Sequence, residues 1–137
     1  MPNFINQALR NKKITIYGDG NQSRSFCYVT DLIDGLIKLM QMDNNFTGPV
    51  NLGSPNEIKI LDLAKKIIDK IDSKSEIFYD KLPDDDPVRR KPDIHLAEKK
   101  LNWKPKIQLN IGLEETINYF SSLNNFDLNQ RLEFESL

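Results

Sequence analysis

The chain has 137 residues, of which 39% are hydrophobic and 28% are charged, and its formal net charge is −1. This length suits one domain or one large piece of a longer protein, and the composition is not that of a disordered chain. Its nineteen basic and twenty acidic residues are spread along the sequence. They therefore give no electrostatic footprint for binding nucleic acid or an anionic membrane.

Three further features of the sequence bear on where in the cell the chain is expected. The longest uninterrupted apolar run has four residues, at 26–29, which is too short for a transmembrane helix. A single cysteine, Cys27, cannot form a disulfide within the chain, which favours a reducing compartment. The first residues lack the basic and apolar stretches of a signal peptide. We therefore expect a cytoplasmic chain that contacts neither a membrane nor nucleic acid.

The first third of the chain predicts two helices and two strands. In order, these are a helix over 3–10, a strand over 14–17, a turn at 18–21, a strand-like run over 25–29, and a helix ending near 43–45. Thr30 or Asp31 has the chemistry of an N-cap for the second helix. That helix carries a one-sided apolar stripe, formed by Ile33, Leu36, Ile37 and Met40.

The remainder of the chain predicts further short strands and helices. These elements are a strand at 50–52, a strand at 58–60, a helix from residue 61, a strand at 76–79, a helix over 94–101 capped by Asp93, and a last amphipathic helix marked by Leu113, Ile117 and Phe120. The expected apolar face of the helix from residue 61 comprises Leu61, Ala64, Ile68 and Ile71. The sequence thus predicts one small mixed α/β domain over 1–123 and a polar, frayed tail over 124–137.

Several kinds of site find little support in the sequence. Gly18-Asp19-Gly20 would need a glycine at position 23 to form a dinucleotide-binding turn, but Ser23 stands there and a strand follows. His95 and Cys27 are far apart in sequence, which argues against a metal site or a nucleophilic pair. The three carboxylates of residues 84–86 could hold a divalent cation, but a solvated loop is the simpler interpretation. We expect this chain to hold neither a metal nor a cofactor.

Three features are better suited to binding an anionic ligand. Arg24 lies where a loop meets a strand, so that its guanidinium can extend from a rigid strand end. Arg89-Arg90-Lys91 offers two planar donors suited to phosphate. Asn51 ends a short strand, where its amide could donate or accept a hydrogen bond. From spacing alone, a surface charge or a turn residue is the favoured interpretation of each of them.

Four segments, in order, resemble the nucleotide-sugar epimerase/dehydratase group of the extended short-chain dehydrogenases/reductases. They are YGDGNQSRSFCYVTDL at 17–32, PVNLG at 49–53, DDPVRRKPDI at 85–94 and LNWKP at 101–105. The amino-acid sequences of the first and third segments most resemble those of the UDP-glucuronate decarboxylases, also called UDP-xylose synthases. The resemblance extends from about residue 2 to residue 122.

The resemblance implies a specific part of such an enzyme. It covers the C-terminal half, which in this group is a small mixed α/β substrate-binding domain, whereas an N-terminal Rossmann domain binds NAD and carries a catalytic Tyr-x-x-x-Lys. The residues four positions after the four tyrosines of this chain are Asn21, Leu32, Pro83 and Leu123, and none is lysine. We therefore expect the Rossmann domain and the hydride-transfer machinery to be absent from this chain, and NAD to be bound only in an intact relative.

The resemblance also assigns expected roles to single residues. Arg24 and Arg90 resemble the two arginines that grip the substrate diphosphate, and Arg90 is in addition a possible auxiliary in proton transfer near the sugar carboxylate. Asn51 resembles a polar contact to the nucleotide. Tyr17 resembles part of a strand bordering the uracil, and Asn3 with Phe4 resembles the helix start that closes over the nucleotide. Asp93, Leu101 and Trp103 are better explained as a cap and as core residues.

The leading hypothesis is therefore the UDP-sugar-binding portion of a UDP-glucuronate decarboxylase-like or epimerase/dehydratase-like enzyme, inactive by itself. Two alternatives remain open: a non-catalytic UDP-sugar-binding module or subunit of a split enzyme, and a non-functional truncated fragment. A domain that normally packs against a partner half should expose an apolar face. We accordingly expect either a Rossmann-domain partner or self-association, through the segment around Phe4 and Ile5.

Overall fold

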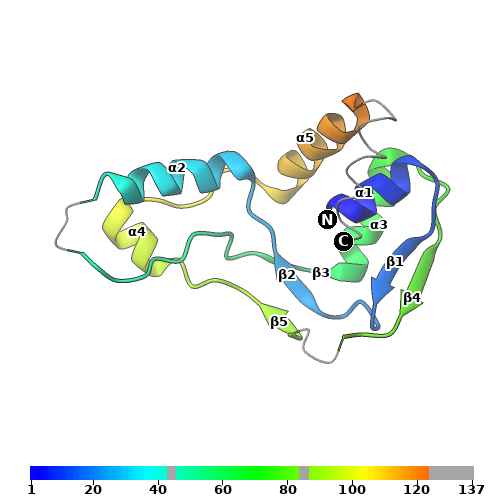
Figure 1. Cartoon of the computed structure of the whole chain (residues 1–137), viewed down its shortest axis with the longest axis horizontal. Coiled ribbons are helices and arrows are strands. Elements are labelled where there is room, and N and C mark those ends of the chain that lie inside the picture. The colour runs from blue at the N-terminus through cyan, green and yellow to red at the C-terminus, as the bar shows by residue number, and fades with distance from the viewer. Residues whose placement is uncertain (43–45, 84–86, 124–137) are drawn as a thin grey trace, which may run out of the picture.

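The computed structural model describes residues 1–42, 46–83 and 87–123, and it has the mixed α/β composition that the sequence predicts. The elements in chain order are α1 (Pro2–Leu9), β1 (Ile14–Tyr17), β2 (Ser23–Ser25), α2 (Val29–Met40), β3 (Glu57–Lys59), α3 (Ile60–Ile71), β4 (Ile77–Asp80), β5 (Arg89–Arg90), α4 (His95–Leu101) and α5 (Leu109–Ser122). Figure 1 shows an elongated molecule, with α1, α3 and α5 toward one end, α2 and α4 toward the other, and β2, β3 and β5 between them.

The larger hydrophobic core joins α1, α3 and α5 to strand β1. Ile14 and Ile16 of β1 are fully buried and alternate with more exposed residues, as expected for a strand that packs on one face. Ile5 of α1 and Leu113 of α5 are buried in the same cluster. β1 pairs in parallel with β4, with Ile14 opposite Ile77. The crossover between these strands contains β2, α2, β3 and α3.

A second, smaller core lies between α2 and α4. It contains Ile94, Ala97, Leu101 and Trp103, all less than 9% exposed. Gly35 permits this packing, because a Cβ at that position would stand 3.0 Å from atoms of both Leu52 and the Trp103 indole. The missing side chain of Gly35 therefore lets the indole lie close to the α2 backbone.

A three-stranded sheet connects the two cores. Its order is β3-β2-β5, with β2 antiparallel to β3 and parallel to β5. The preceding turn uses Gly18 and Gly20, whose φ angles are +73° and +75°, a region that L side chains rarely adopt. The glycine-rich segment is thus a turn between β1 and β2, as the sequence predicts.

The structure corrects the predictions around the second strand. The strand lies at 23–25, rather than 25–29, because the chain then crosses between the cores: Phe26 packs against the larger core and Cys27 against the smaller one. Helix α2 begins at Val29 with Tyr28 as its N-cap residue, so neither Thr30 nor Asp31 caps it. Asp31 is instead buried inside the helix, at 7% exposure.

Two further predictions are wrong in detail. Residues 50–52 do not form a strand; they pair with no strand in the described ranges, and Asn51 Nδ2 instead donates to the Asp93 carbonyl at 3.1 Å. The deepest face of α3 comprises Leu63, Ala64 and Ile67, whereas Leu61, Ile68 and Ile71 are partly buried at its margins. The most buried face of α3 differs from the predicted one because both α1 and α5 cover this helix, so that a wider stripe of it is buried.

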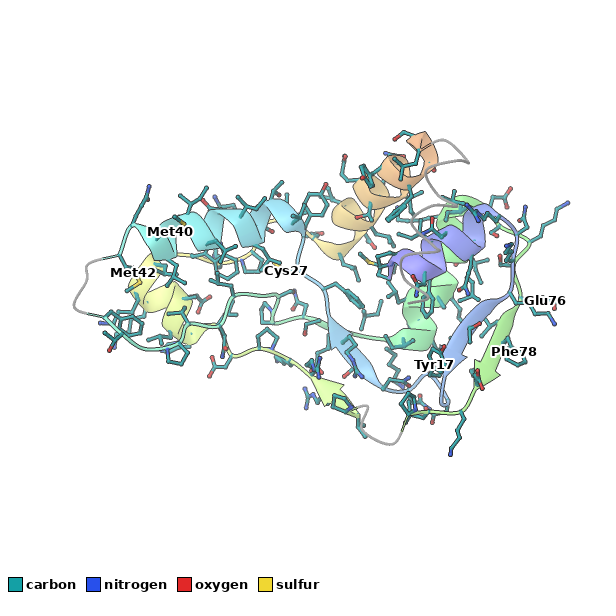
Figure 2. The ribbon with its side chains drawn as sticks, in the orientation of Figure 1. Tyr17, Cys27, Met40, Met42, Glu76 and Phe78 are labelled. Carbon is teal, nitrogen blue, oxygen red and sulfur yellow. The ribbon has the colours of Figure 1, made fainter. Side chains whose placement is uncertain are left out.

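The apolar stripe of α2 does not face the core. Its exposed side chains range from 49% to 85% exposure, and they are Val29, Ile33, Leu36, Ile37 and Met40. Met40 lies at the end of α2 that is farther from α5 (Figure 2). The opposite side of the helix, with Asp31 and Gly35, is the buried one. The expected apolar patch is therefore on α2 rather than around Ile5, which is fully buried.

The remaining predictions concern residues outside the described ranges, the start of α4 and the length of the helices. The carboxylates of 84–86 and the tail from 124 are not among the described residues. Helix α4 begins at His95 with Ile94 as its N-cap residue, so Asp93 is not the predicted cap, although Asp93 Oδ1 accepts a hydrogen bond from the His95 backbone N–H at 2.9 Å. None of the helices within the described ranges is both long and apolar enough to span a membrane.

Replacing Asp31 by alanine should destabilise the fold. Asp31 Oδ2 accepts hydrogen bonds from the backbone N–H groups of Lys106 and Ile107, at 3.0 and 2.8 Å. An alanine at this position would leave both N–H groups without this acceptor. We expect Asp31→Ala to lower the free energy of unfolding by about 1–3 kcal/mol. Asp34→Ala, on the same helix and with a 45% exposed side chain, should change it by only about 0.5 kcal/mol. Urea denaturation of both variants tests this, and equal losses would contradict it.

Candidate functional site

The register of β2 and β5 places two arginines side by side. Arg24 pairs with Arg90 in the parallel ladder, so their Cα atoms belong to neighbouring strands about 4.8 Å apart. Both side chains line one cavity of about 610 Å³. The two arginines that the sequence singles out therefore line the same concavity from adjacent strands, although they are far apart in the chain.

The cavity as a whole has mixed polar and apolar walls and carries net positive charge. Asn51 lines it, held by the hydrogen bond from its amide to the Asp93 carbonyl. Lys91 adds a third cation, and Asp93 is the one carboxylate among those lining residues that belong to the described part of the chain. One Asp93 oxygen already accepts the His95 N–H at the start of α4. Such an arrangement favours a compact anion with several acceptor oxygens.

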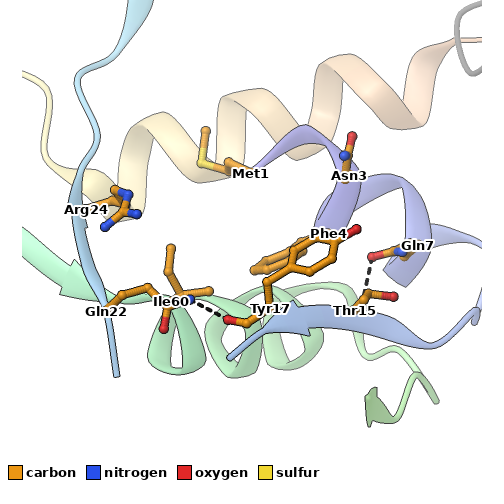
Figure 3. A pocket seen from close by; sticks show the side chains of 9 residues that line it. All are labelled: Met1, Asn3, Phe4, Gln7, Thr15, Tyr17, Gln22, Arg24 and Ile60. Carbon is orange, nitrogen blue, oxygen red and sulfur yellow. Dashed lines mark hydrogen bonds between the residues drawn. The ribbon is translucent and has the colours of Figure 1, made fainter. Parts of the chain in front are cut away.

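A second cavity, of about 340 Å³, adjoins the first at Arg24. It is lined by Asn3 and Phe4 of α1, by Tyr17 of β1, and by Arg24 of β2. Figure 3 shows Arg24 on the side of this cavity opposite Phe4 and Tyr17. Gln22 lies on its floor and donates from Nε2 to the Tyr17 carbonyl at 2.6 Å, which ties the end of β1 to β2. Tyr17 thus borders a different cavity from Arg90, and Arg24 belongs to both.

Arg89 does not take part in either cavity. Its Nε donates to the two oxygens of Glu57 at 2.9 and 2.8 Å, and its Nη2 also donates to Oε2. Ser23 Oγ donates to Glu57 Oε1 at 2.7 Å. The hydrogen bonds from Arg89 first, and from Ser23 second, lower the pKa of Glu57 from 4.5 to about 2. Of the two arginines that the sequence offers for phosphate, only Arg90 lines the cavity.

Sequence reasoning missed some lining residues. Lys91 and Cys27 line the larger cavity, and Gln22 lines the smaller one. Lys91 belongs to the Arg89-Arg90-Lys91 run that the sequence singles out, although no role is predicted for it, whereas nothing in the pattern identifies Gln22. Cys27 lies between β2 and α2 (Figure 2), and burial first, then the nearby Asp31, raise the pKa of its thiol. That shift disfavours the thiolate, so the structure gives no support for Cys27 as a nucleophile.

The described residues do not build a dinucleotide cradle at the glycine-rich turn. The segment leads into β2 rather than into a helix, and a Cβ at Gly20 would stand 2.9 Å from the Leu61 Cβ. Gly20 therefore packs against α3 instead of leaving room for a pyrophosphate. Within 1–42, 46–83 and 87–123, no group of three or more histidine, cysteine or acidic residues could hold a metal ion. The cation alternative at 84–86 falls outside those ranges.

Comparison with known proteins confirms the family resemblance. Residues 1–53 match the model of the NAD dependent epimerase/dehydratase family. The chain is 46% identical over 118 residues to UDP-glucuronic acid decarboxylase 1 of Arabidopsis thaliana, and 47% identical over 119 residues to the Danio rerio protein of the same name. These alignments cover 86% and 87% of the chain, but only 27% and 28% of the relatives.

Solved structures give the same result for the fold. UDP-glucuronic acid 4-epimerase from Bacillus cereus, in complex with UDP-glucuronic acid and NAD, superposes with a TM-score of 0.83 at 29% identity. An epimerase from Methanothermobacter thermautotrophicus superposes with a TM-score of 0.86 at 27% identity. The matches cover 89% and 95% of this chain, and 39% and 38% of the solved chains. The chain therefore spans about a quarter of the curated relatives and two fifths of these structures.

The Glu57 ion pair should make stability depend on pH in a defined window. A carboxylate whose pKa falls on folding stabilises the fold above its unfolded value, and this contribution is lost as the pH drops through the folded value. The difference in unfolding free energy between wild type and Glu57→Gln should thus be largest above about pH 5 and should shrink toward pH 2. Denaturant melts at several pH values measure it, with the exposed Glu76→Gln as the matched substitution. A difference that grows toward acid would contradict the assignment.

Proposed function

We propose that this chain, a relative of the NAD-dependent epimerase/dehydratase family, supplies the substrate-binding part of an enzyme that modifies a UDP-sugar. The observation that carries the proposal is the pairing of Arg24 with Arg90 at the wall of one cavity. The proposal is supported by the decarboxylase relatives and by the Bacillus cereus epimerase, whose structure holds UDP-glucuronic acid and NAD. The roles of single residues follow from the chemistry of the two cavities.

The diphosphate is bound between Arg24 and Arg90. Guanidinium groups present planar pairs of N–H donors that match phosphate oxygens, and such charge-assisted hydrogen bonds are stronger than neutral ones. Two arginines on neighbouring strands can each serve one phosphate of the diphosphate. Lys91 adds positive charge at the same wall, and Asn51 supplies a polar contact to the nucleotide from across the cavity.

The nucleobase is bound in the smaller cavity. Phe4 and Tyr17 offer aromatic surface there, and Asn3 offers an amide that can read the polar edge of uracil. Stacking of a base on an aromatic side chain contributes about 1–3 kcal/mol. Arg24 borders both cavities, so a diphosphate bound to it lies between the base on one side and the sugar on the other.

The chain's contribution to the reaction is positioning. Holding the diphosphate and base fixes the sugar relative to the reacting groups, and such fixed geometry removes much of the entropic barrier. Arg90 is the one site residue with a possible auxiliary role beside a sugar carboxylate. The sequence contains no Tyr-x-x-x-Lys, and its glycine-rich turn packs on α3, so the NAD-dependent chemistry belongs to a partner portion. The domain is assigned to residues 1–123, and a cytoplasmic location remains a prediction.

Substituting either site arginine should weaken UDP binding. A hydrogen bond to a charged group contributes about 1.5–3 kcal/mol, so Arg24→Ala and Arg90→Ala should each raise the Kd for UDP about ten- to a hundredfold. Titrations followed by NMR suit the millimolar range expected of a half-enclosed site. Arg10→Ala, at the end of α1 and outside both cavities, is the matched control. Unchanged binding in both site variants would refute the proposal.

The partner portion packs on the exposed face of α2. Five apolar side chains line one side of this helix, and contiguous apolar patches of this kind mark interaction surfaces. The chain spans only 39% of the Bacillus cereus epimerase, which is solved with NAD. A dinucleotide-binding portion is accordingly the occupant we assign to this face.

A charge on the α2 face should abolish this association. Leu36→Glu places a carboxylate within the stripe, whereas Gln41→Glu adds the same charge at an exposed position beyond it. Binding to the separately expressed portion of the zebrafish decarboxylase that this chain does not match should be lost in the first variant and kept in the second. Sedimentation velocity measures both. Leu36-dependent dimers of this chain alone would assign the face to a second copy instead.

A further inference from the structure

We infer that Glu57 is a positioning residue for the diphosphate site: by binding Arg89 and Ser23 it holds β5 in register on β2, so that Arg90 lies beside Arg24. This inference rests on the function proposed above. It assigns a role to a carboxylate that lines neither of the two cavities and contacts no residue assigned there to the ligand.

The backbone alone gives β5 little support. The strand has only two residues, and it forms the edge of the sheet order β3-β2-β5. Around it, the Ser23 N–H donates to the Val88 carbonyl at 3.1 Å, and Ser25 Oγ donates to the Arg90 carbonyl at 3.4 Å, which is long for a hydroxyl donor. A ladder this short is weakly specified in register.

The Glu57 carboxylate supplies the missing specification. Glu57 belongs to β3, at the other edge, yet its two oxygens accept hydrogen bonds from Ser23 of β2 and Arg89 of β5. One carboxylate thus connects all three strands. The contact with Arg89 uses both carboxylate oxygens, a geometry that fixes orientation as well as distance. The Glu57 side chain is 14% exposed and that of Arg89 is 69% exposed, so the arginine reaches from the surface to a mostly covered carboxylate.

The connection decides which of two adjacent arginines faces the ligand. Successive side chains of a strand point to opposite faces, so a slip of one residue would exchange Arg89 and Arg90. Glu57 is placed to capture Arg89, which leaves Arg90 aligned with Arg24. It also compensates the charge of Arg89 away from the larger cavity, where Arg90 and Lys91 remain available to an anion.

The test measures UDP binding in Glu57→Gln, Arg89→Gln and the double variant. Each single change should raise the Kd about three- to tenfold, as for the loss of part of one hydrogen bond at the ligand. The double variant should be no worse than either single one, because both changes break the same link. Arg89→Lys should restore part of the loss, and Glu76→Gln, exposed and next to the other sheet, should change nothing. Thermal melts verify folding, which Arg89→Gln should retain because its side chain is exposed.

A second measurement does not need the ligand. In ligand-free protein, Glu57→Gln should speed amide hydrogen exchange at residues 23–25 and 89–90 but not at 14–17 or 77–80. Unchanged exchange at residues 23–25 and 89–90 would overturn the inference even if UDP binding could not be detected.

The binding outcomes separate the inference from the proposed function. If UDP binding is weakened in Arg24→Ala and Arg90→Ala but unchanged in the Glu57 and Arg89 variants, the positioning role alone is overturned. Weaker binding in Arg89→Gln together with tighter binding in Glu57→Gln would mean that Arg89 contacts the ligand itself, which also overturns it. Additive losses in the double variant would do the same.

Discussion

The parallel contact between β2 and β5 is the constraint on which the candidate site depends. These strands contribute three and two residues, and together they bring Arg24 next to Arg90. Neither hydrophobic core includes β5, so packing does not determine where this strand lies. A charged link through Glu57 determines it instead. Polar links of this kind specify geometry better than they add stability, because an exposed partner such as Arg89 gains little net energy from its ion pair.

The two cores set a second constraint. Neither is large, and the smaller one closes around Trp103, whose indole Nε1 donates to the Asp31 carbonyl at 2.9 Å. Helix α2 turns Asp31, Gly35 and Leu39 toward this core and its apolar stripe toward solvent. An amphipathic helix oriented in this way is incomplete by itself, because burying the stripe against another surface is what its sequence favours. The exposed stripe is thus the feature that supports the partner contact proposed above.

Much of the fold could be predicted from local pattern. β1, α4 and α5 match the predicted segments closely, since their apolar spacing reflects contact with a single core. The prediction for α2 identified the helix but not its orientation, because periodicity shows that a stripe exists and cannot show what covers it. The strand at 25–29 was misplaced for a related reason: Phe26 and Cys27 alternate toward two different cores, which imitates the alternation of a strand.

The candidate site was predictable only in part. Arg24, Arg90 and Asn51 were identified through their motifs, and the structure brings them to one cavity. Their ligand-binding roles remain predictions. The separation of Arg89 from Arg90 was not predictable, because it depends on the register of a strand that only a distant glutamate determines. Tyr17 was expected beside the same ligand, and it borders the adjoining cavity, which it shares with Arg24.

The position of the site between the cores links it to the surface of α2. Gly35 brings the helix backbone against Leu52, and Leu52 lines the larger cavity next to Asn51. The wall that carries Asn51 is therefore supported from behind by the same helix whose front face is exposed. A partner that packs on that face would fix α2, and through Leu52 it would fix Asn51 relative to the two arginines. Binding of the partner and binding of the nucleotide would then favour each other, because each restricts the same segment of chain.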